Sequence, residues 1–317
     1  MALAYLLGGG LSPESRAGVA LHQAYPAVRR CYQELQELTG LTQDQLLTDE
    51  LPEESGQRQS ISAIRQAAVA FGIHDVLAEA GVHPAVIGGL SLGGLVGGCL
   101  TGAVSRFELY GLLGRLRGIP EVPAGAPAEG IALAFIPAGE DPRGYYGGAR
   151  ADVYLACDFG PTVDGGKRML MLTGHREALD EMEEELPPGT MAVLDEIESA
   201  IHCPLARSAA DHLAPFVDAL RIDDPRIPLC SSLEPRTLTA AGDIRDLMHR
   251  NPVEPVSILH VISELERHGT TLALVLGPSI PEGIIPFPFP VVHITEPEHV
   301  EKALAAVREH GLDTAAG

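Results

Sequence analysis

An apolar run meets a glycine-rich turn between residues 84 and 103, and this junction leaves few choices of fold. Residues 84–88 predict a short buried strand, the sequence GLSLGG follows at 89–94, and small apolar residues continue to 103. A serine in the pattern Gly-x-Ser-x-Gly between a strand and a helix sits on a strained turn, and the next amide, here that of Leu92, can stabilise an oxyanion. We therefore expect a strand–turn–helix unit with Ser91 as a nucleophile. The alternative is a tight turn in which the glycines serve packing and Ser91 caps the helix.

The rest of the chain alternates between strand-like and helix-like runs. Strands are expected at residues 1–7, 131–135, 153–156, 169–172, 271–276 and 291–294. Helices are expected at 11–40, 61–80, 175–185, 204–220, 244–249 and 255–268, with a loop at 46–58. This alternation indicates an α/β fold with a mainly parallel sheet and helices on both faces. No run reaches the roughly 18 to 20 apolar residues that a spanning helix requires, so no membrane span is predicted.

The middle of the chain differs in composition from both ends. Residues 119–130 are rich in Pro, Gly and Ala, which is typical of a linker, and Pro187-Pro188-Gly189 marks a second break. The strand-like runs and the charged helix between these breaks predict a small α+β subdomain inserted in the larger fold.

Charge and cysteine usage exclude several classes of function. The formal net charge is −21, and the resulting negative potential works against binding of nucleic acid or an anionic membrane surface. The five cysteines are widely spaced and form no CxxC or Cys/His metal pattern. The first residues, MALAYLLGGG, lack the positive region of a signal peptide. We therefore expect reduced thiols, no metal site and a cytoplasmic location.

A serine nucleophile needs a base, and His202 is the candidate among the 12 histidines. It follows the apolar Ile201 and precedes a helix that Pro204 would begin. A side chain at such a junction can point into a cleft; a hydrogen-bonded core histidine is the alternative.

Five motifs occur in one order along the chain. They are GLSLGG with Ser91, LRG with Arg117, GHREA at 174–178, IHC with His202, and NPVE at 251–254. Together they resemble the malonyl-CoA:acyl-carrier-protein transacylase family and the related acyltransferase domains of polyketide synthases. The resemblance runs from the first strand to about residue 280. It implies a hydrolase-like parallel-sheet core at 1–125 and 196–317, with a ferredoxin-like α+β subdomain inserted at 126–195.

The resemblance also implies a reaction. An acyl group, of malonyl type or an unusual chain, would pass from a thioester of coenzyme A or a carrier protein to Ser91. It would then pass to the phosphopantetheine arm of an acyl carrier protein in polyketide or fatty-acid assembly. No permanently bound cofactor or metal is implied, and the partners are acyl-CoA and the carrier protein.

Each motif residue takes a role by this resemblance. Ser91 would be the nucleophile, His202 the base, and Gly9 and Leu92 the backbone donors to the oxyanion. Arg117 would grip the free carboxylate of a malonyl-type group. Leu90 and Ile201 would form part of the pocket wall. A main-chain carbonyl near Glu254 would orient His202, with the Asn251 side chain close by.

The chain departs from the family pattern around the serine. Leu90 stands where the family has histidine, Gly94 where it has glutamate, and the first loop reads LGGG instead of PGQG. These changes predict a less polar and larger pocket. If Arg117 is instead a surface arginine beside Arg115, a neutral or unusual acyl chain is expected.

Three rival interpretations stay open. A patatin-like lipid acyl hydrolase would use a glycine loop at 8–10, Ser91 and Asp164 in a DGG motif. A carrier-protein thioester hydrolase could use the same scaffold, and a degenerate subunit could only bind a carrier protein.

An acidic carrier protein requires a basic patch on this chain. Five basic residues of the insertion could form this patch, or they could belong to a scattered solvated surface. They are Arg143, Arg150, Lys167, Arg168 and Arg176.

Overall fold

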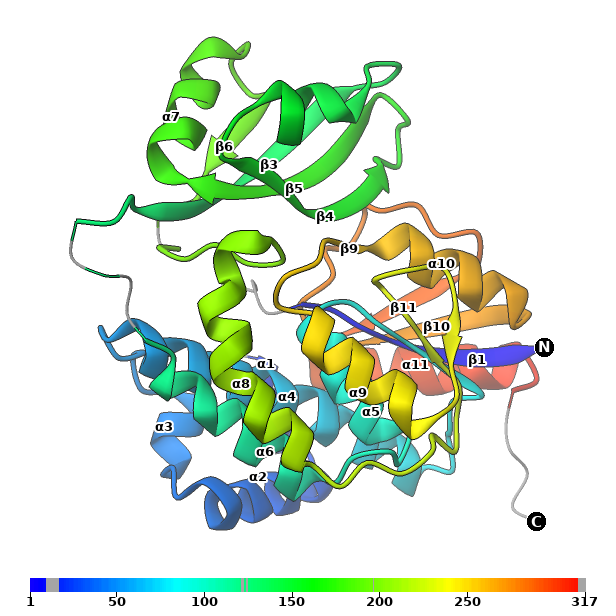
Figure 1. Ribbon diagram of the computed structural model, residues 1–317. Coiled ribbons are helices and arrows are strands. Elements are labelled where there is room, and N and C mark those ends of the chain that lie inside the picture. The colour runs from blue at the N-terminus through cyan, green and yellow to red at the C-terminus, as the bar shows by residue number, and fades with distance from the viewer. Residues whose placement is uncertain (10–16, 121–122, 124, 196, 313–317) are drawn as a thin grey trace.

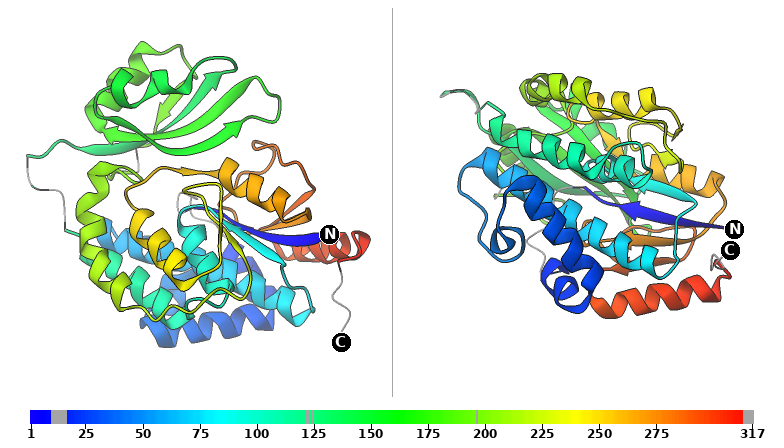
Figure 2. Two further views of the ribbon diagram at one scale, coloured as in Figure 1. Left: turned by 45° about the vertical axis from the view of Figure 1, so that its right-hand side comes forward. Right: turned by 90° about the horizontal axis from the view of Figure 1, so that it is seen from below.

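The computed structural model describes residues 1–9, 17–120, 123, 125–195 and 197–312. Gly10 of the predicted glycine loop lies outside these residues. The structure has a large core built on a six-stranded sheet and a smaller lobe built on a second sheet (Figures 1 and 2).

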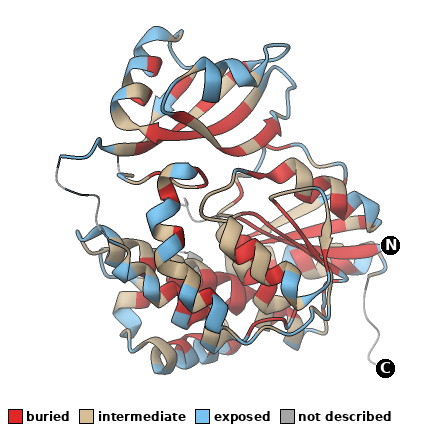
Figure 3. Ribbon diagram, viewed as in Figure 1, coloured by how far each residue is buried: buried red, intermediate tan, exposed pale blue. Residues whose placement is uncertain are grey.

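The core sheet has the strand order β11-β10-β1-β2-β7-β8. All neighbouring strands are parallel except β7 and β8, which are antiparallel. The strands are β1 Ala2–Leu7, β2 Val86–Gly89, β7 Leu229–Cys230, β8 Thr237–Leu238, β10 Thr270–Leu276 and β11 Val291–Ile294. Every residue of β1 is buried, as expected for a continuous apolar run with both faces covered (Figure 3).

Helices cover both faces of this sheet. They are α1 Ala17–Ala24, α2 Pro26–Thr39, α3 Gln43–Leu47, α4 Ser55–Glu79, α5 Leu92–Leu100, α6 Arg106–Arg115, α8 Arg207–Ala219, α9 Ala241–Arg250, α10 Ile258–Arg267 and α11 Pro297–Glu309. Short 3-10 turns are η1 Leu116–Gly118 and η4 Pro204–Ala206. The predicted loop at 46–58 is shorter than expected, because α3 and α4 occupy both of its ends.

Alternate residues of β1 face two different cores, as the two-residue period of a strand requires. Leu3, Tyr5 and Leu7 pack with helices that include α2, α4 and α6. Ala4 and Leu6 pack with α10 and with residues of the second sheet. The second sheet is therefore joined to the core sheet by shared apolar packing.

The second sheet has the order β6-β3-β5-β4-β9. Apart from β9, Val256–Ser257, the elements of this lobe are β3 Glu129–Pro137, η2 Pro142–Tyr145, η3 Gly147–Ala149, β4 Val153–Pro161, β5 Lys167–His175, α7 Arg176–Glu185 and β6 Met191–Val193. This order of elements is that of a ferredoxin-like unit, with 3-10 turns in place of the first helix. The elements lie inside the predicted range 126–195, whose boundaries stay a prediction.

One strand of the second sheet comes from the core, which the sequence did not indicate. β9, Val256–Ser257, pairs in parallel with β4 at Cys157 and Asp158. The helix expected at 255–268 therefore begins only at Ile258. A two-residue strand carries no recognisable period, so only the pairing reveals it.

Helix α4 corrects the expectation that no segment is long and apolar enough to cross a membrane. Its 25 residues are long and apolar enough to cross a membrane, and 56% of its most apolar 18-residue stretch is buried in the structure. The helix packs against α2, α6 and η1, with Ile64, Phe71 and Leu77 in the core. A core helix passes the same test, and the packing identifies α4 as one.

Candidate active site

Ser91 occupies the turn between β2 and α5, with φ 56° and ψ −121°. Positive φ is strained for a residue with a Cβ and persists only where the surroundings impose it. A Cβ on Gly89 would lie 2.3 Å from the Gly93 carbonyl oxygen, and one on Gly93 would lie 2.3 Å from that of Leu7. Both glycines are therefore required by packing, and they hold Ser91 at the carboxyl edge of the sheet.

His202 lies against this turn. Its Nε2 is 2.7 Å from the Ser91 Oγ, although 111 residues separate the two in the chain. The His202 side chain is buried, and its backbone also has a positive φ, 54°. The structure thus brings the predicted nucleophile and base into hydrogen-bonding distance.

The other ring nitrogen of His202 is fixed by a main-chain carbonyl. Nδ1 donates to the Asn251 oxygen at 2.5 Å, so Nε2 is left as the acceptor for the Ser91 hydroxyl. Asn251 follows α9, whose last carbonyls have no intrahelical partner and carry the negative end of the helix dipole. This carbonyl can orient the ring and stabilise an imidazolium.

The sequence predicted that a main-chain carbonyl near Glu254 orients His202. The bond from Nδ1 goes to the Asn251 oxygen at 2.5 Å, and the Glu254 main chain also hydrogen-bonds His202. The Glu254 carboxylate pairs with Arg250. The Asn251 Oδ1 is buried and makes no hydrogen bond with the described residues.

Burial sets the protonation state of His202. It lowers the pKa to about 4, against the opposing effect of the main-chain hydrogen bonds to Asn251 and Glu254. The imidazole is therefore neutral near pH 7 and can act as a base.

Two backbone segments flank Ser91 where an oxyanion would form. A Cβ on Gly9 would lie 3.1 Å from the Ser91 Cβ, so this loop passes directly beside the serine. The Leu90 amide donates to the Leu7 carbonyl at 2.9 Å, which ties the loop to the turn. Leu92 is the first residue of α5, and its amide has no intrahelical acceptor.

The two apolar residues of the predicted pocket wall lie in the core shared by the two sheets. Leu90 is buried there, and Ile201 is half-buried and packs against it. Leu90 immediately precedes Ser91, and Ile201 immediately precedes His202.

Arg117 lies on η1 with its side chain exposed. Its Nε donates to the Gly114 carbonyl at 2.8 Å, and the structure brings it into no hydrogen bond with Ser91 or His202 in the described part of the chain. Its two terminal nitrogens make no hydrogen bond with described residues.

The patatin-like alternative finds no support in this arrangement. Asp164 is exposed in the turn between β4 and β5, where it accepts from the Thr162 hydroxyl and the Gly166 amide. The partner of Ser91 is His202, and the DGG sequence forms a turn.

The arginines of the second sheet's lobe are engaged with neighbouring carboxylates. The pairs are Arg143–Asp141, Arg150–Glu185, Arg168–Asp158, Arg176–Asp180 and Arg176–Asp195. Lys167 lies over the Phe135 ring at 6.0 Å. These pairs weaken the case for a basic patch on this lobe.

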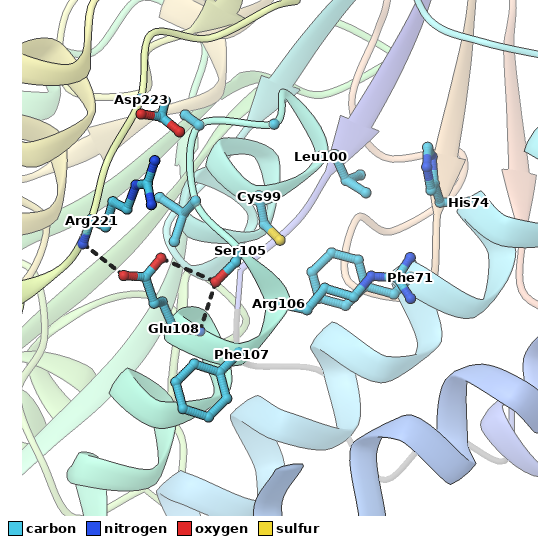
Figure 4. A pocket seen from close by; sticks show the side chains of 13 residues that line it. Phe71, His74, Cys99, Leu100, Ser105, Arg106, Phe107, Glu108, Arg221 and Asp223 are labelled. Atoms are coloured by element: carbon cyan, nitrogen blue, oxygen red, sulfur yellow. Dashed lines mark hydrogen bonds between the residues drawn. The ribbon is translucent and has the colours of Figure 1, made fainter. Parts of the chain in front are cut away.

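A cavity of about 620 Å³ has Cys99 and Leu100 in its lining (Figure 4). These two residues end α5, whereas Ser91 precedes its first residue. Phe107 stands at it, largely exposed, and Glu108 accepts from the Arg221 amide and is held by Ser105. Arg106 is paired with Asp75. Neither Ser91 nor His202 lines this cavity, and the nine-residue helix that lies between it and Ser91 is about 13.5 Å long.

Three side chains that the sequence did not single out support the segment before His202. Gln59 donates to the Ser199 hydroxyl at 3.1 Å. Glu129 accepts from the Ala200 amide at 2.8 Å, and Thr173 from the Ile201 amide at 3.3 Å. No local pattern could have revealed them, because each partner lies at least 28 residues away.

No protein-family model matches the sequence. The chain is 23% identical to the malonyl CoA-acyl carrier protein transacylase of Bacillus subtilis, over 97% of this chain and 98% of that protein. This similarity confirms the resemblance read from the motifs.

Solved structures of such enzymes share the fold. The transacylase from Helicobacter pylori superposes with a TM-score of 0.81 at 14% identity, covering 98% of this chain and 100% of the other. A malonyl-transacylase solved with a type II polyketide synthase acyl-carrier protein gives 0.78 at 18% identity, covering 96% and 100%. The predicted class, a hydrolase-like α/β core with a ferredoxin-like subdomain, is confirmed.

Proposed function

We propose that this chain is a serine acyltransferase of the malonyl-CoA:acyl-carrier-protein transacylase type. It moves an acyl group from a thioester of coenzyme A or a carrier protein to the phosphopantetheine arm of an acyl carrier protein. The observation that carries the proposal is the 2.7 Å contact between the Ser91 Oγ and the His202 Nε2 on a strained strand–helix turn. The names of the similar proteins, a transacylase and a carrier-protein complex, support the choice of substrates.

In the first half-reaction His202 Nε2 takes the Ser91 proton as Oγ bonds to the thioester carbon. The negative charge on the carbonyl oxygen faces the amides of Gly9 and Leu92. The carbon–sulfur bond then breaks, and the thiolate leaves with the proton from His202. In the second half-reaction the carrier-protein thiol gives its proton to His202 and its sulfur bonds to the ester carbon. The bond from this carbon to the Ser91 Oγ then breaks, and Oγ takes the proton back from His202.

The acyl group is assigned through Arg117. Because Nε is held on the Gly114 carbonyl, the two terminal guanidinium nitrogens remain available as a fork for a carboxylate. Leu90 and Ile201 supply an apolar wall for the acyl chain. We propose a malonyl-type group where this fork meets the bound acyl chain, and a neutral or unusual chain where the exposed Arg117 does not reach it; the labelling below distinguishes the two. We also propose no resident cofactor, limits of 126–195 for the inserted subdomain, and a cytoplasmic location.

Acyl-enzyme formation tests the proposal. The protein is incubated with malonyl-CoA and, separately, with neutral acyl-CoAs, and the adduct is located by intact mass and peptide mapping. We expect a malonyl adduct on Ser91 that is absent in Ser91→Ala and strongly reduced in Arg117→Ala, with Arg115→Ala as the matched control.

Labelling by neutral acyl groups alone would overturn the role of Arg117 and keep the serine chemistry. Addition of a holo acyl carrier protein should then discharge the adduct to the carrier thiol. Release of free acid instead would identify a thioester hydrolase.

A further inference from the structure

His202 has a backbone conformation that something must hold in place. Its φ of 54° lies in the left-handed region, which is strained for a residue with a Cβ. Its ring nitrogens are bonded on both sides, yet those bonds orient the ring and do not restrain the chain that carries it. The restraint comes from the two residues before it.

The second sheet supplies that restraint. The Ala200 amide donates to Glu129 Oε2 at 2.8 Å, and the Ile201 amide donates to Thr173 Oγ1 at 3.3 Å. Glu129 is the first residue of β3, and Thr173 lies in β5 on the neighbouring strand. The segment entering His202 is thus bound to two strands of the small lobe.

The Thr173 hydroxyl has a fixed direction. It is fully buried and donates its proton to the Gly130 carbonyl at 3.0 Å. Its oxygen accepts from the Ile201 amide, and the same hydroxyl also hydrogen-bonds the Cys203 thiol on the other side of His202. The single hydroxyl links β3, β5 and the residue before the base.

We propose that Thr173 is a positioning residue for His202, assisted by Glu129. By holding the Ile201 amide, Thr173 keeps the strained His202 backbone and hence the Nε2 to Ser91 Oγ distance. The inference rests on the proposed function only in taking His202 as the base of Ser91. Through it, the small lobe contributes to proton transfer between Ser91 and His202.

The test uses a fluorophosphonate, whose attack by Ser91 needs the base but no particular acyl group. Ser91 Oγ bonds to phosphorus, fluoride leaves, and the proton goes to His202. In Thr173→Val we expect the maximal inactivation rate to fall about 10-fold or more with the reagent's half-saturation concentration unchanged, because small displacements of a reacting group are costly. Thr173→Ser keeps the hydroxyl and should restore most of the rate.

Thr101→Val is the matched control. Thr101 is equally buried and donates to a glycine carbonyl, that of Gly98, at 2.8 Å, but at the far end of α5. The Thr101→Val protein should have a lower free energy of unfolding and an unchanged rate of inactivation at Ser91. A Thr173→Val protein with a rate within twofold of wild type would overturn the proposal and leave the acyltransferase assignment intact.

Glu129→Ala keeps the test decisive if Thr173→Val does not fold. Glu129 is only half-buried, and its loss should slow inactivation several-fold, whereas Glu140→Ala, an exposed acceptor in the same lobe, should not. An unchanged rate in Glu129→Ala would count against the proposal. Failure of the wild type to react at Ser91 would refute the proposed function and this inference together.

Discussion

At the scale of single residues, the site depends on the burial of His202. Burial lowers its pKa to about 4, well below the ordinary histidine value, and an imidazolium cannot accept the Ser91 proton. The imidazole that we propose as the base therefore stays neutral at pH values where an exposed histidine would be protonated. Between about pH 6.5 and 4 the unfolded chain binds a proton here that the folded chain does not, so stability falls as pH drops through this window.

The rate of Ser91 acylation should follow the same titration. We expect a nearly constant single-turnover rate from about pH 8 to 5 and a decline below, with a midpoint near pH 4. His202→Ala should reduce the plateau by roughly 10²–10⁴-fold. A decline centred near pH 6.5 would show that the imidazole is solvated in the working enzyme, contrary to its buried position.

At the scale of elements, the close packing of the β2–α5 turn against its neighbours requires glycine at particular positions. A Cβ on Gly93 would lie 2.3 Å from the Leu7 carbonyl oxygen, whereas one on Gly94 would make ordinary contacts, 3.4 Å from Leu247 and 3.6 Å from the Gly89 carbonyl oxygen. The two glycines are adjacent in the same helix, yet only the first is needed where β1 meets the turn.

Alanine substitutions at Gly93 and Gly94 test whether packing requires glycine at each position. Gly93→Ala should lower the free energy of unfolding by about 2 kcal/mol or more, because backbone must move. Gly94→Ala should be neutral or slightly stabilising, because alanine favours a helix. Chemical denaturation of both variants measures this, and equal losses would contradict the assigned contacts.

At the scale of the whole molecule, the two sheets share one apolar core. Leu6 from β1, Ile131 from β3 and Met171 from β5 belong to it, together with Ile258 at the start of α10. A second small core, with Leu179 and Met182 of α7, lies on the other side of the small sheet. The lobe is therefore attached by packing and by β9 as well as by its linkers.

We expect this shared core to make unfolding one cooperative transition. Ile131→Ala and Leu179→Ala should each cost about 2–5 kcal/mol, since both side chains are fully buried. Calorimetry should show a single peak that moves to lower temperature in both variants. Two peaks, with Leu179→Ala moving only one, would mean that the lobe melts independently.

The features that the sequence alone determined are local ones. The apolar runs mark most strands, and the spacing of glycines around Ser91 predicts the turn, because sterics act between near neighbours. The motif order also identified the resemblance and paired Ser91 with His202. The motif order also identified Arg117, but it could not show that the Arg117 side chain is exposed.

Tertiary structure alone decided which groups hold the base. The carbonyl that accepts from His202 Nδ1 at 2.5 Å belongs to Asn251, which follows the end of α9 and lies 49 residues from His202 in the chain. Thr173 reaches Ile201, and β9 joins β4, only because distant segments are folded together. Hydrogen bonds between partners far apart in sequence leave no periodic trace in the chain, so they become visible only when the backbone is folded.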